Sequence, residues 1–172
     1  KFYKQLTPEH LSSIKVVTGD GAKWITECVN EYTPGCARCV DPFHVVEWAM
    51  TALDEVRKDI WHDAYSEYKQ VKKDNPRGKG RPKKDAPGLA IVKAAKAKAD
   101  EIKGSAYALG KAPEHLSEKQ QLRVNLIASQ NPRLYRAYLL KEQLRLLLKL
   151  TNVDEAEDEL KRWLWKASHS RI

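Results

Sequence analysis

The chain has 172 residues and a formal net charge of +8 at pH 7, and 42% of its residues are hydrophobic. This length is typical of one domain, or of one domain with an appendage, and it allows a buried core of ordinary size. The sequence shows neither an apolar run long enough to span a membrane nor a secretory leader, so no membrane partner is predicted. Three cysteines are too few for a disulfide framework and favour a reducing compartment. We therefore expect a cytoplasmic protein.

The chain is predicted to begin with a short helix, a strand and a second helix. Residues 2–11 favour a helix, with Thr7 as its N-cap and Pro8 in its first turn. Residues 14–18, IKVVT, are rich in β-branched side chains, as is usual for a short buried strand, and Asp20 follows the carboxyl end of this strand. Apolar residues then recur at helical intervals, which predicts a helix with one apolar face made of Trp24, Ile25, Cys28, Val29 and Tyr32.

A second strand repeats this arrangement. Residues 38–40 form a minimal strand, and Asp41 closes it as Asp20 closes the first. Apolar residues at helical spacing then run from Phe43 to about Val71, which predicts a long helix. Two strands joined through a helix are usually parallel, so both aspartates are expected at one edge of a sheet, where open α/β sheets commonly bind ligands.

The excess positive charge is concentrated in one stretch. Residues 69–84 contain eight basic residues and one acid, and residues 75–88 contain three prolines and three glycines. This composition predicts an exposed, mobile loop. Its centre, RGKGRPKK, resembles an AT-hook, a motif that enters the minor groove of A·T-rich DNA. We expect the DNA contacts to come from Arg77, Lys79, Arg81, Lys83 and Lys84; a basic linker that only keeps the chain soluble is the alternative.

The remainder of the chain predicts helices and no strand. Alanine and lysine dominate a helix over residues 89–103, and Ser117 and Gln120 form a capping box for a helix that ends near Ser129. A third helix begins at Pro132 and carries a leucine-rich apolar stripe as far as residue 150. A last helix over residues 153–167 has acidic residues at its start, which suits the helix dipole.

The two aspartates are candidates for metal binding. Carboxylates on rigid strand ends suit hard cations such as Mg²⁺, and phosphoryl transfer is accelerated when two such ions stabilise the attacking and leaving oxygens. The alternative for Asp20 and for Asp41 is a carboxylate that only caps a helix or completes a turn.

Two other groups of residues favour structural roles. Cys36 and Cys39 form a CxxC pair near His44, but a structural zinc site needs about four ligands and the sequence has no second pair, so half-buried thiols are the preferred interpretation. The aromatic residues on apolar helical faces are predicted to lie in the core rather than to stack on nucleic-acid bases; they are Trp24, Trp48, Trp61, Tyr65 and Tyr68.

Several segments together resemble the bacterial insertion-sequence transposases of the DDE class, in the ISL-three group. VVTGDGAKWITECV resembles the strand that holds the second catalytic aspartate, and RCVDPFHVVEWAMTALDEVRK closely resembles the family's Asp-x-Phe-His-Val-Val signature and the helix after it. The helical region is similar over KGSAYALGKAPEHLSEKQ, NPRLYRAYLLKEQLR and WLWKASHSRI. The resemblance therefore covers most of the chain.

The resemblance implies an RNase H-like core in which three acids bind two Mg²⁺ ions and DNA strands are cut and joined. Asp20 matches the second acid, which is a catalytic residue and a metal ligand. Asp41 and His44 match an Asp-x-x-His motif that supports the site. The first aspartate and the final glutamate are expected to precede Lys1 and to follow Ile172, so this fragment alone should be inactive. The implied partners are transposon ends, A·T-rich in composition, and further copies of the transposase on DNA associated with the nucleoid.

The predicted fold is therefore α/β, with three parts. Residues 1–74 form a partial RNase H-like βαβ core with a long exit helix, residues 75–88 form the basic mobile loop, and residues 89–172 form an all-helical insertion. Two other functions stay open at this point. One is a non-catalytic DNA-binding module that uses the loop 75–88, and the other is a scaffold that binds proteins through its leucine-rich stripe.

Overall fold

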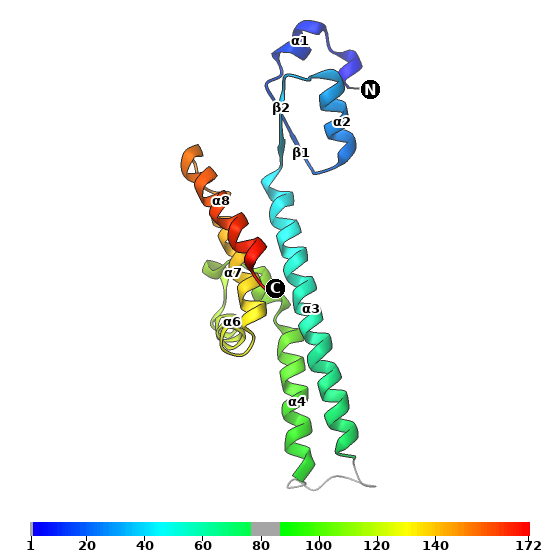
Figure 1. Cartoon of the computed structure of the whole chain (residues 1–172), viewed down its shortest axis with the longest axis vertical. Coiled ribbons are helices and arrows are strands. Elements are labelled where there is room, and N and C mark those ends of the chain that lie inside the picture. The colour runs from blue at the N-terminus through cyan, green and yellow to red at the C-terminus, as the bar shows by residue number, and fades with distance from the viewer. Residues whose placement is uncertain (1, 77–86) are drawn as a thin grey trace. The chain divides into compact units, whose positions relative to one another are not determined.

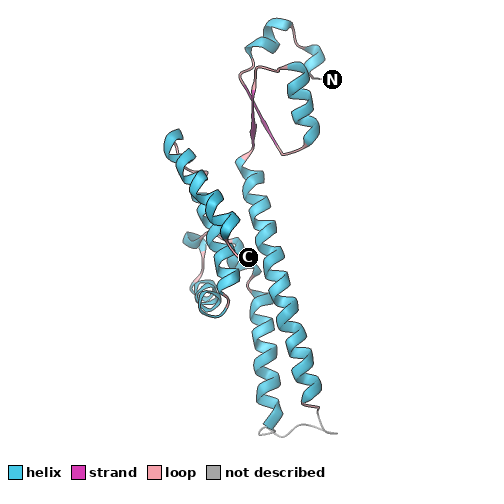
Figure 2. Cartoon of the chain, viewed as in Figure 1, coloured by secondary structure: helices cyan, strands magenta, loops and turns pink. Residues whose placement is uncertain are grey.

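A computed structural model describes residues 2–76 and 87–172, and most of these residues are helical (Figure 1, Figure 2). They divide into two compact units, Lys1–Ala49 and Met50–Ile172. The first unit contains a 3₁₀ helix and four regular elements: η1 (Tyr3–Gln5), α1 (Pro8–Ser13), β1 (Val16–Gly19), α2 (Lys23–Tyr32) and β2 (Ala37–Val40). The long helix α3 (Pro42–Asp74) begins in the first unit and continues into the second. The division predicted from the sequence, with its boundaries at residues 74 and 88, stays a prediction.

The first unit contains the predicted strand, helix, strand order. Strands β1 and β2 pair in parallel, with Val16 opposite Ala37 and Gly19 opposite Val40. Helix α2 connects them, and α3 begins directly after β2, as expected from the sequence. These two strands are the whole of the sheet within the described residues, so the α/β character is present but small.

The predicted helix over residues 2–11 is wrong in its limits. Tyr3–Gln5 forms a separate 3₁₀ helix, and α1 begins only at Pro8. Thr7 is extended, with φ −74° and ψ 161°, and its side chain accepts a hydrogen bond of 3.3 Å from the backbone N–H of His10. The N-cap was therefore placed correctly, and the capping residue itself interrupts the helix that was expected to run through it.

Three of the aromatic residues that were assigned to the core are exposed. The exposed fractions of Trp24, Trp48 and Tyr65 are 65%, 51% and 37%. Val29 is the buried apolar residue of α2, with 1% exposed. Helical periodicity identified an apolar face in each case, but periodicity does not reveal whether the described part of the chain covers that face.

The second unit is helical throughout its described residues. Its elements after α3 are α4 (Pro87–Gly104), α5 (Ala106–Gly110), η2 (Pro113–His115), α6 (Glu118–Gln130), α7 (Pro132–Leu147) and α8 (Val153–His169). Helix α4 lies beside the later part of α3 (Figure 1), and Lys98 on α4 pairs with Glu67 on α3 at 2.7 Å. The core of the unit is made of Leu53, Ala64, Ala99, Ile102, Ala108, Leu109, Val124, Ile127, Leu134, Ala137 and Tyr138.

The helical predictions for the second unit hold, with small differences. Ser117 and Gln120 form the predicted capping box of α6, and Asn152 caps α8 through a 3.2 Å bond from the N–H of Glu155. Helix α4 begins at Pro87, two residues earlier than expected, and neither α5 nor η2 was predicted. Much of the leucine-rich stripe packs inside its own unit, with Leu134, Tyr138 and Leu144 buried. These three residues are therefore not available as a protein interface. No described helix is long and apolar enough to span a membrane.

Candidate active site at the strand ends

The two candidate aspartates follow neighbouring strand ends. Gly19 is the register partner of Val40, and Asp20 and Asp41 are the next residues on each strand. The backbone N–H of Asp41 donates a 2.8 Å hydrogen bond to the carbonyl oxygen of Gly19, which extends the ladder to the aspartate itself. The expected placement at one edge of a parallel pair is confirmed, while the catalytic role of Asp20 stays a prediction.

Each carboxylate completes a turn with one of its two oxygens. Asp20 Oδ1 accepts a 2.9 Å bond from the N–H of Ala22, and Asp41 Oδ1 accepts a 2.9 Å bond from the N–H of Phe43. The described residues supply no hydrogen-bond donor to Oδ2 of either aspartate. The capping role considered for these residues is therefore real, and it fixes each side chain while leaving its second oxygen for another ligand.

The oxygen donors of this edge fit part of a Mg²⁺ site. Magnesium in proteins is commonly held by one or two carboxylates together with water and substrate phosphate, rather than by a complete protein cage. Among the described residues no group of three or more His, Cys, Asp or Glu side chains is placed to hold a metal. Asp20 and Asp41 thus have suitable chemistry for an ion shared with substrate, but not for a closed structural site.

Arg38 contributes a cation that the sequence analysis overlooked. Its side chain extends from β2 to the strand ends, where Nη2 donates to the carbonyl oxygen of Asp20 and Nη1 donates to the carbonyl oxygen of Cys39. Its Nε is buried and has no hydrogen-bond partner among the described residues. Arg38 therefore fixes the backbone of Asp20. Neither spacing nor composition in the sequence marks this contact.

His44 lies on the first turn of α3, as predicted. The backbone N–H of His44 donates a 3.0 Å hydrogen bond to the carbonyl oxygen of Asp41, and the ring nitrogen Nδ1 lies 3.3 Å from Oε2 of Glu47. One third of the His44 side chain is exposed. A carboxylate on Nδ1 holds the imidazole ring in a fixed orientation and leaves Nε2 as the nitrogen that faces other partners. The supporting role of His44 stays a prediction.

Trp48 packs against the turn that carries Asp20. A Cβ atom on Gly21 would lie 2.4 Å from Cη2 and 2.6 Å from Cζ2 of the indole, so only glycine allows this close approach. Trp48 follows His44 by one helical turn on α3. The contact thereby links the Asp20 turn to helix α3, which follows Asp41 directly and carries His44.

Substituting Gly21 by alanine is expected to displace the Trp48 ring. Trp48 is half exposed and can rotate into solvent, so the cost should be about 1 kcal/mol from lost packing rather than unfolding. The measurement is the NMR shift of the Trp48 indole N–H together with the unfolding midpoint. Gly35→Ala is the matched control, because no atom lies within 4 Å of a Cβ at that position. An unmoved Trp48 resonance in Gly21→Ala would contradict this packing.

Two further groups of residues were considered in the sequence. Cys36 is half-buried and Cys39 is exposed, and both are free thiols, which agrees with the structural interpretation for Cys36 only. The expected DNA-binding cations lie outside the residues that the structure describes; they are Arg77, Lys79, Arg81, Lys83 and Lys84.

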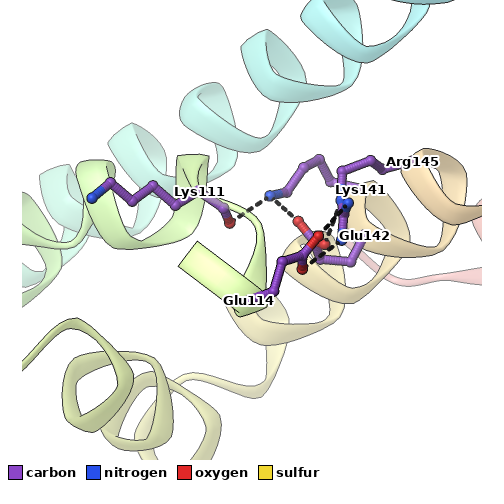
Figure 3. A network of polar contacts seen from close by, with 5 residues as sticks. All are labelled: Lys111, Glu114, Lys141, Glu142 and Arg145. Atoms are coloured by element: carbon purple, nitrogen blue, oxygen red, sulfur yellow. Dashed lines mark hydrogen bonds and ion pairs between the residues drawn. The ribbon is translucent and has the colours of Figure 1, made fainter. Parts of the chain in front are cut away.

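A buried ionic network in the second unit was not predicted. Lys141 and Glu142 are only 3% and 6% exposed, although both are charged residues of α7 (Figure 3). Lys141 Nζ pairs with Oε1 of Glu142 and lies 3.4 Å from the carbonyl oxygen of Lys111. Arg145 Nε lies 2.9 Å from Oε2 of Glu142, and its two terminal nitrogens reach Glu114 at 2.9 and 3.1 Å. Charge periodicity did not reveal this network because neighbouring residues of a helix point in different directions.

Burial changes the acid–base properties of this network. Desolvation lowers the pKa of Lys141 below its usual value, although Glu142 acts in the opposite direction. Desolvation, and then the charge of Glu142, raise the pKa of the neighbouring Tyr138 to about 12. The ammonium of Lys141 also lies 4.9 Å from the centre of the Tyr138 ring. The described contacts of these groups lie within their own unit, so we interpret the network as structural.

Comparison with known proteins identifies the family. A family model described as Transposase, that of the ISL3 group of DDE enzymes, matches residues 1–172. Two curated relatives from Mycobacterium tuberculosis, strains CDC 1551 / Oshkosh and ATCC 25618 / H37Rv, are each named as the transposase for insertion sequence element IS1557. Each is 40% identical to this chain over 172 residues.

The alignment covers 99% of this chain but only 37% of each relative, so the chain spans little more than a third of their length. No solved structure matches the chain, and the RNase H-like architecture therefore stays a prediction. The match to the family model, in contrast, extends over every residue of the chain and agrees with the resemblance seen around Asp20 and Asp41. The chain belongs to the ISL3 family of DDE transposases.

Proposed function

We propose that this chain forms part of the catalytic region of a transposase that cuts and joins DNA strands by two-metal phosphoryl transfer. The observation that carries the proposal is the parallel pairing of Gly19 with Val40, which brings Asp20 and Asp41 to adjacent strand ends. Family membership supplies the reaction class, and the free second oxygen of each aspartate supplies suitable chemistry. In this proposal Asp20 is a catalytic metal ligand, and Asp41 and His44 support it.

Divalent ions bound at such a site stabilise the charge that develops on the attacking and leaving oxygens of the phosphate. The residues of this chain contribute by holding the Asp20 and His44 side chains in fixed positions. The turn to Ala22 and the bond from Arg38 hold Asp20 at its backbone and at one oxygen. The Glu47 contact to Nδ1 orients His44. A fixed carboxylate favours ion binding because little conformational freedom is lost when the ion arrives.

DNA at the transposon ends is the proposed substrate, and the basic loop over residues 75–88 is proposed to contact it. Phosphate contacts by lysine and arginine supply affinity for any DNA sequence, and Arg81 between Gly80 and Pro82 suits an A·T-rich minor groove. The same loop was considered as the basis of a non-catalytic DNA-binding module. The family match favours the transposase. In this proposal the loop serves the transposase as an additional DNA contact.

The proposal is tested by strand cleavage on duplex DNA that carries the ends of the element. The complete transposase is expected to cleave the DNA in the presence of Mg²⁺ and to be inactive in EDTA, and adding Mg²⁺ back should restore cleavage. The 172-residue chain alone is expected to be inactive, because the other two acids of the triad are proposed to lie outside it. Cleavage in EDTA would refute the metal mechanism, and Mg²⁺-dependent cleavage by this chain alone would refute its description as a fragment.

A further inference from the structure

Helix α8 presents one tryptophan to its own unit and another to solvent. Trp163 donates a 2.9 Å hydrogen bond from Nε1 to the carbonyl oxygen of Leu140 on α7, which fixes the rotation of α8 against α7. Trp165, two residues later, is therefore turned away, and 64% of it is exposed. A large apolar ring is thereby left in contact with water beside the α7 and α8 contact.

Trp165 is held in place rather than free. Its ring stacks on the imidazole of His169, with 4.6 Å between ring centres and 22° between planes. Nδ1 of His169 lies 2.8 Å from the carbonyl oxygen of Trp165, which fixes the imidazole one turn further along α8. The two rings together form a rigid aromatic surface, so a flat ligand that stacks here orders few additional side chains.

This aromatic surface borders an open pocket of about 320 Å³, at the lower end of the volumes found for small-ligand sites. The pocket lies between α7 and α8, and its lining residues are Arg136, Leu139, Leu140, Gln143, Trp165, Lys166, His169 and Ser170. No acidic residue is among them. A second pocket along α8 differs, since Glu155 and Glu159 line it together with Lys166.

The cations of the aromatic pocket have no ionic partner among the described residues. Arg136 and Lys166 are exposed and form no ion pair there, whereas the nearby Arg133 pairs with Asp59 at 3.9 Å and Arg162 pairs with Glu159. Two unpaired cations beside an exposed, rigid indole constitute a site for an anion with a flat ring. A purely apolar partner would fit this charge poorly.

We propose that the pocket between α7 and α8 binds an unpaired nucleotide of DNA, with its base stacked on Trp165 and its phosphate held by Arg136 and Lys166. The proposal rests on DNA being the substrate, as proposed above, and it adds a second contact distant in sequence from Asp20. Exposed aromatic rings beside cations are the usual platform for single strands, since every base has a face that can stack. Gln143 and Ser170 supply hydrogen-bonding groups at the rim for the edge of the base.

The test compares two labelled DNAs in EDTA by fluorescence anisotropy, using the 172-residue chain. One is a 12-nucleotide oligothymidine, and the other is a fully paired duplex of the same length. Trp165→Ala is expected to weaken binding of the single strand about tenfold and to leave duplex binding unchanged. Trp165→Phe should retain most of the affinity because phenylalanine also stacks. Trp24→Ala is the matched control, since that tryptophan is equally exposed at 65% but lies on α2.

A second variant keeps the test decisive if Trp165→Ala folds poorly. Arg136→Ala with Lys166→Ala should reduce the slope of log affinity against log salt by about 0.7 for the single strand, since the two residues are proposed to hold one phosphate and each phosphate contact contributes about 0.7. Equal single-strand affinity in Trp165→Ala and the parent chain would overturn the proposal, as would a phenylalanine variant that loses as much as alanine. An unchanged slope would do the same.

The assay also separates this inference from the proposed reaction. Binding in EDTA requires no metal and no Asp20, so a failed cleavage experiment leaves the Trp165 result intact. Conversely, a parent chain that binds duplex through other cations, with no effect of Trp165→Ala, removes the nucleotide pocket but not the transposase mechanism.

Discussion

Replacing Asp20 by asparagine in the complete transposase is expected to abolish strand cleavage, with a loss of at least about 10³-fold. Asparagine has the same shape, and its amide oxygen still accepts the bond from the N–H of Ala22, so the turn should persist. What disappears is the negative charge that a divalent ion needs. Several kcal/mol of transition-state stabilisation depend on such an ion, and each 1.4 kcal/mol corresponds to a tenfold rate.

The Asp20→Asn experiment needs a control for charge and for folding. Asp158→Asn removes the same charge from an exposed position on α8, and the complete transposase with this substitution should cleave DNA at the normal rate. Circular dichroism and DNA affinity should be unchanged in both variants. If Asp20→Asn cleaved at the normal rate, the carboxylate would have only its turn-forming role, and the proposed site would be wrong.

Replacing Glu142 by glutamine is expected to destabilise the second unit by about 3–5 kcal/mol. Glu142 is the shared partner of Lys141 and Arg145. Glutamine in its place leaves the buried ammonium of Lys141 with neutral partners alone, which are the new amide, the carbonyl oxygen of Lys111 and the Tyr138 ring. Arg145 keeps its ion pair with Glu114, so most of the lost stability comes from the buried ammonium of Lys141, whose charge is no longer balanced. The midpoint temperature of thermal unfolding should fall by about 10 °C, and hydrogen exchange of the backbone amides along α7 should become faster.

The same variant should respond to pH with a defined sign. The pKa of Lys141 is already lowered by burial, so the unfolded chain binds more protons than the folded one below pH 10.5. Stability therefore rises with pH through the interval between the folded pKa and 10.5. Loss of Glu142 removes an interaction that raises the pKa of Lys141, so the folded pKa falls further and Glu142→Gln should gain more stability than the parent chain as the pH rises toward 10.5.

Two controls make this result specific. Glu157→Gln breaks an exposed ion pair with Lys161 and should cost less than about 1 kcal/mol. Lys141→Met combined with Glu142→Leu removes both buried charges and should recover most of the stability, because well-packed apolar residues often replace a buried pair without loss. A single Glu142→Gln variant as stable as the parent would show that Lys141 already escapes to solvent.

Local sequence signals predicted much of this fold. Thr7, Ser117 and Asn131-Pro132 marked helix starts that the structure confirms within one residue, since capping is decided by a few adjacent atoms. The parallel pairing of the strands followed from the helix between them. Trp24 and Trp48 were misplaced because burial depends on partners distant in sequence, which one apolar face does not specify.

For the candidate site, the sequence predicted where the backbone places the residues but not which side chains contact one another. Asp20, Asp41 and His44 stand at strand or helix ends, and their positions followed from element order. Arg38 and Trp48 join the site through side chains that extend across the sheet end, and neither spacing nor composition encodes such contacts. The Lys141 and Glu142 network escaped prediction for a different reason, because charged residues in a helix are normally expected in water.

The two-strand sheet has a consequence for how this chain behaves on its own. Among the described residues β1 and β2 each have one strand neighbour, so the outer backbone groups of each strand are unpaired by any strand. Parallel sheets normally have more strands and are covered on both faces, and Val16 on β1 is 57% exposed. Open edges of this kind recruit strands from other molecules. The isolated polypeptide should therefore self-associate through intermolecular β-pairing as its concentration rises.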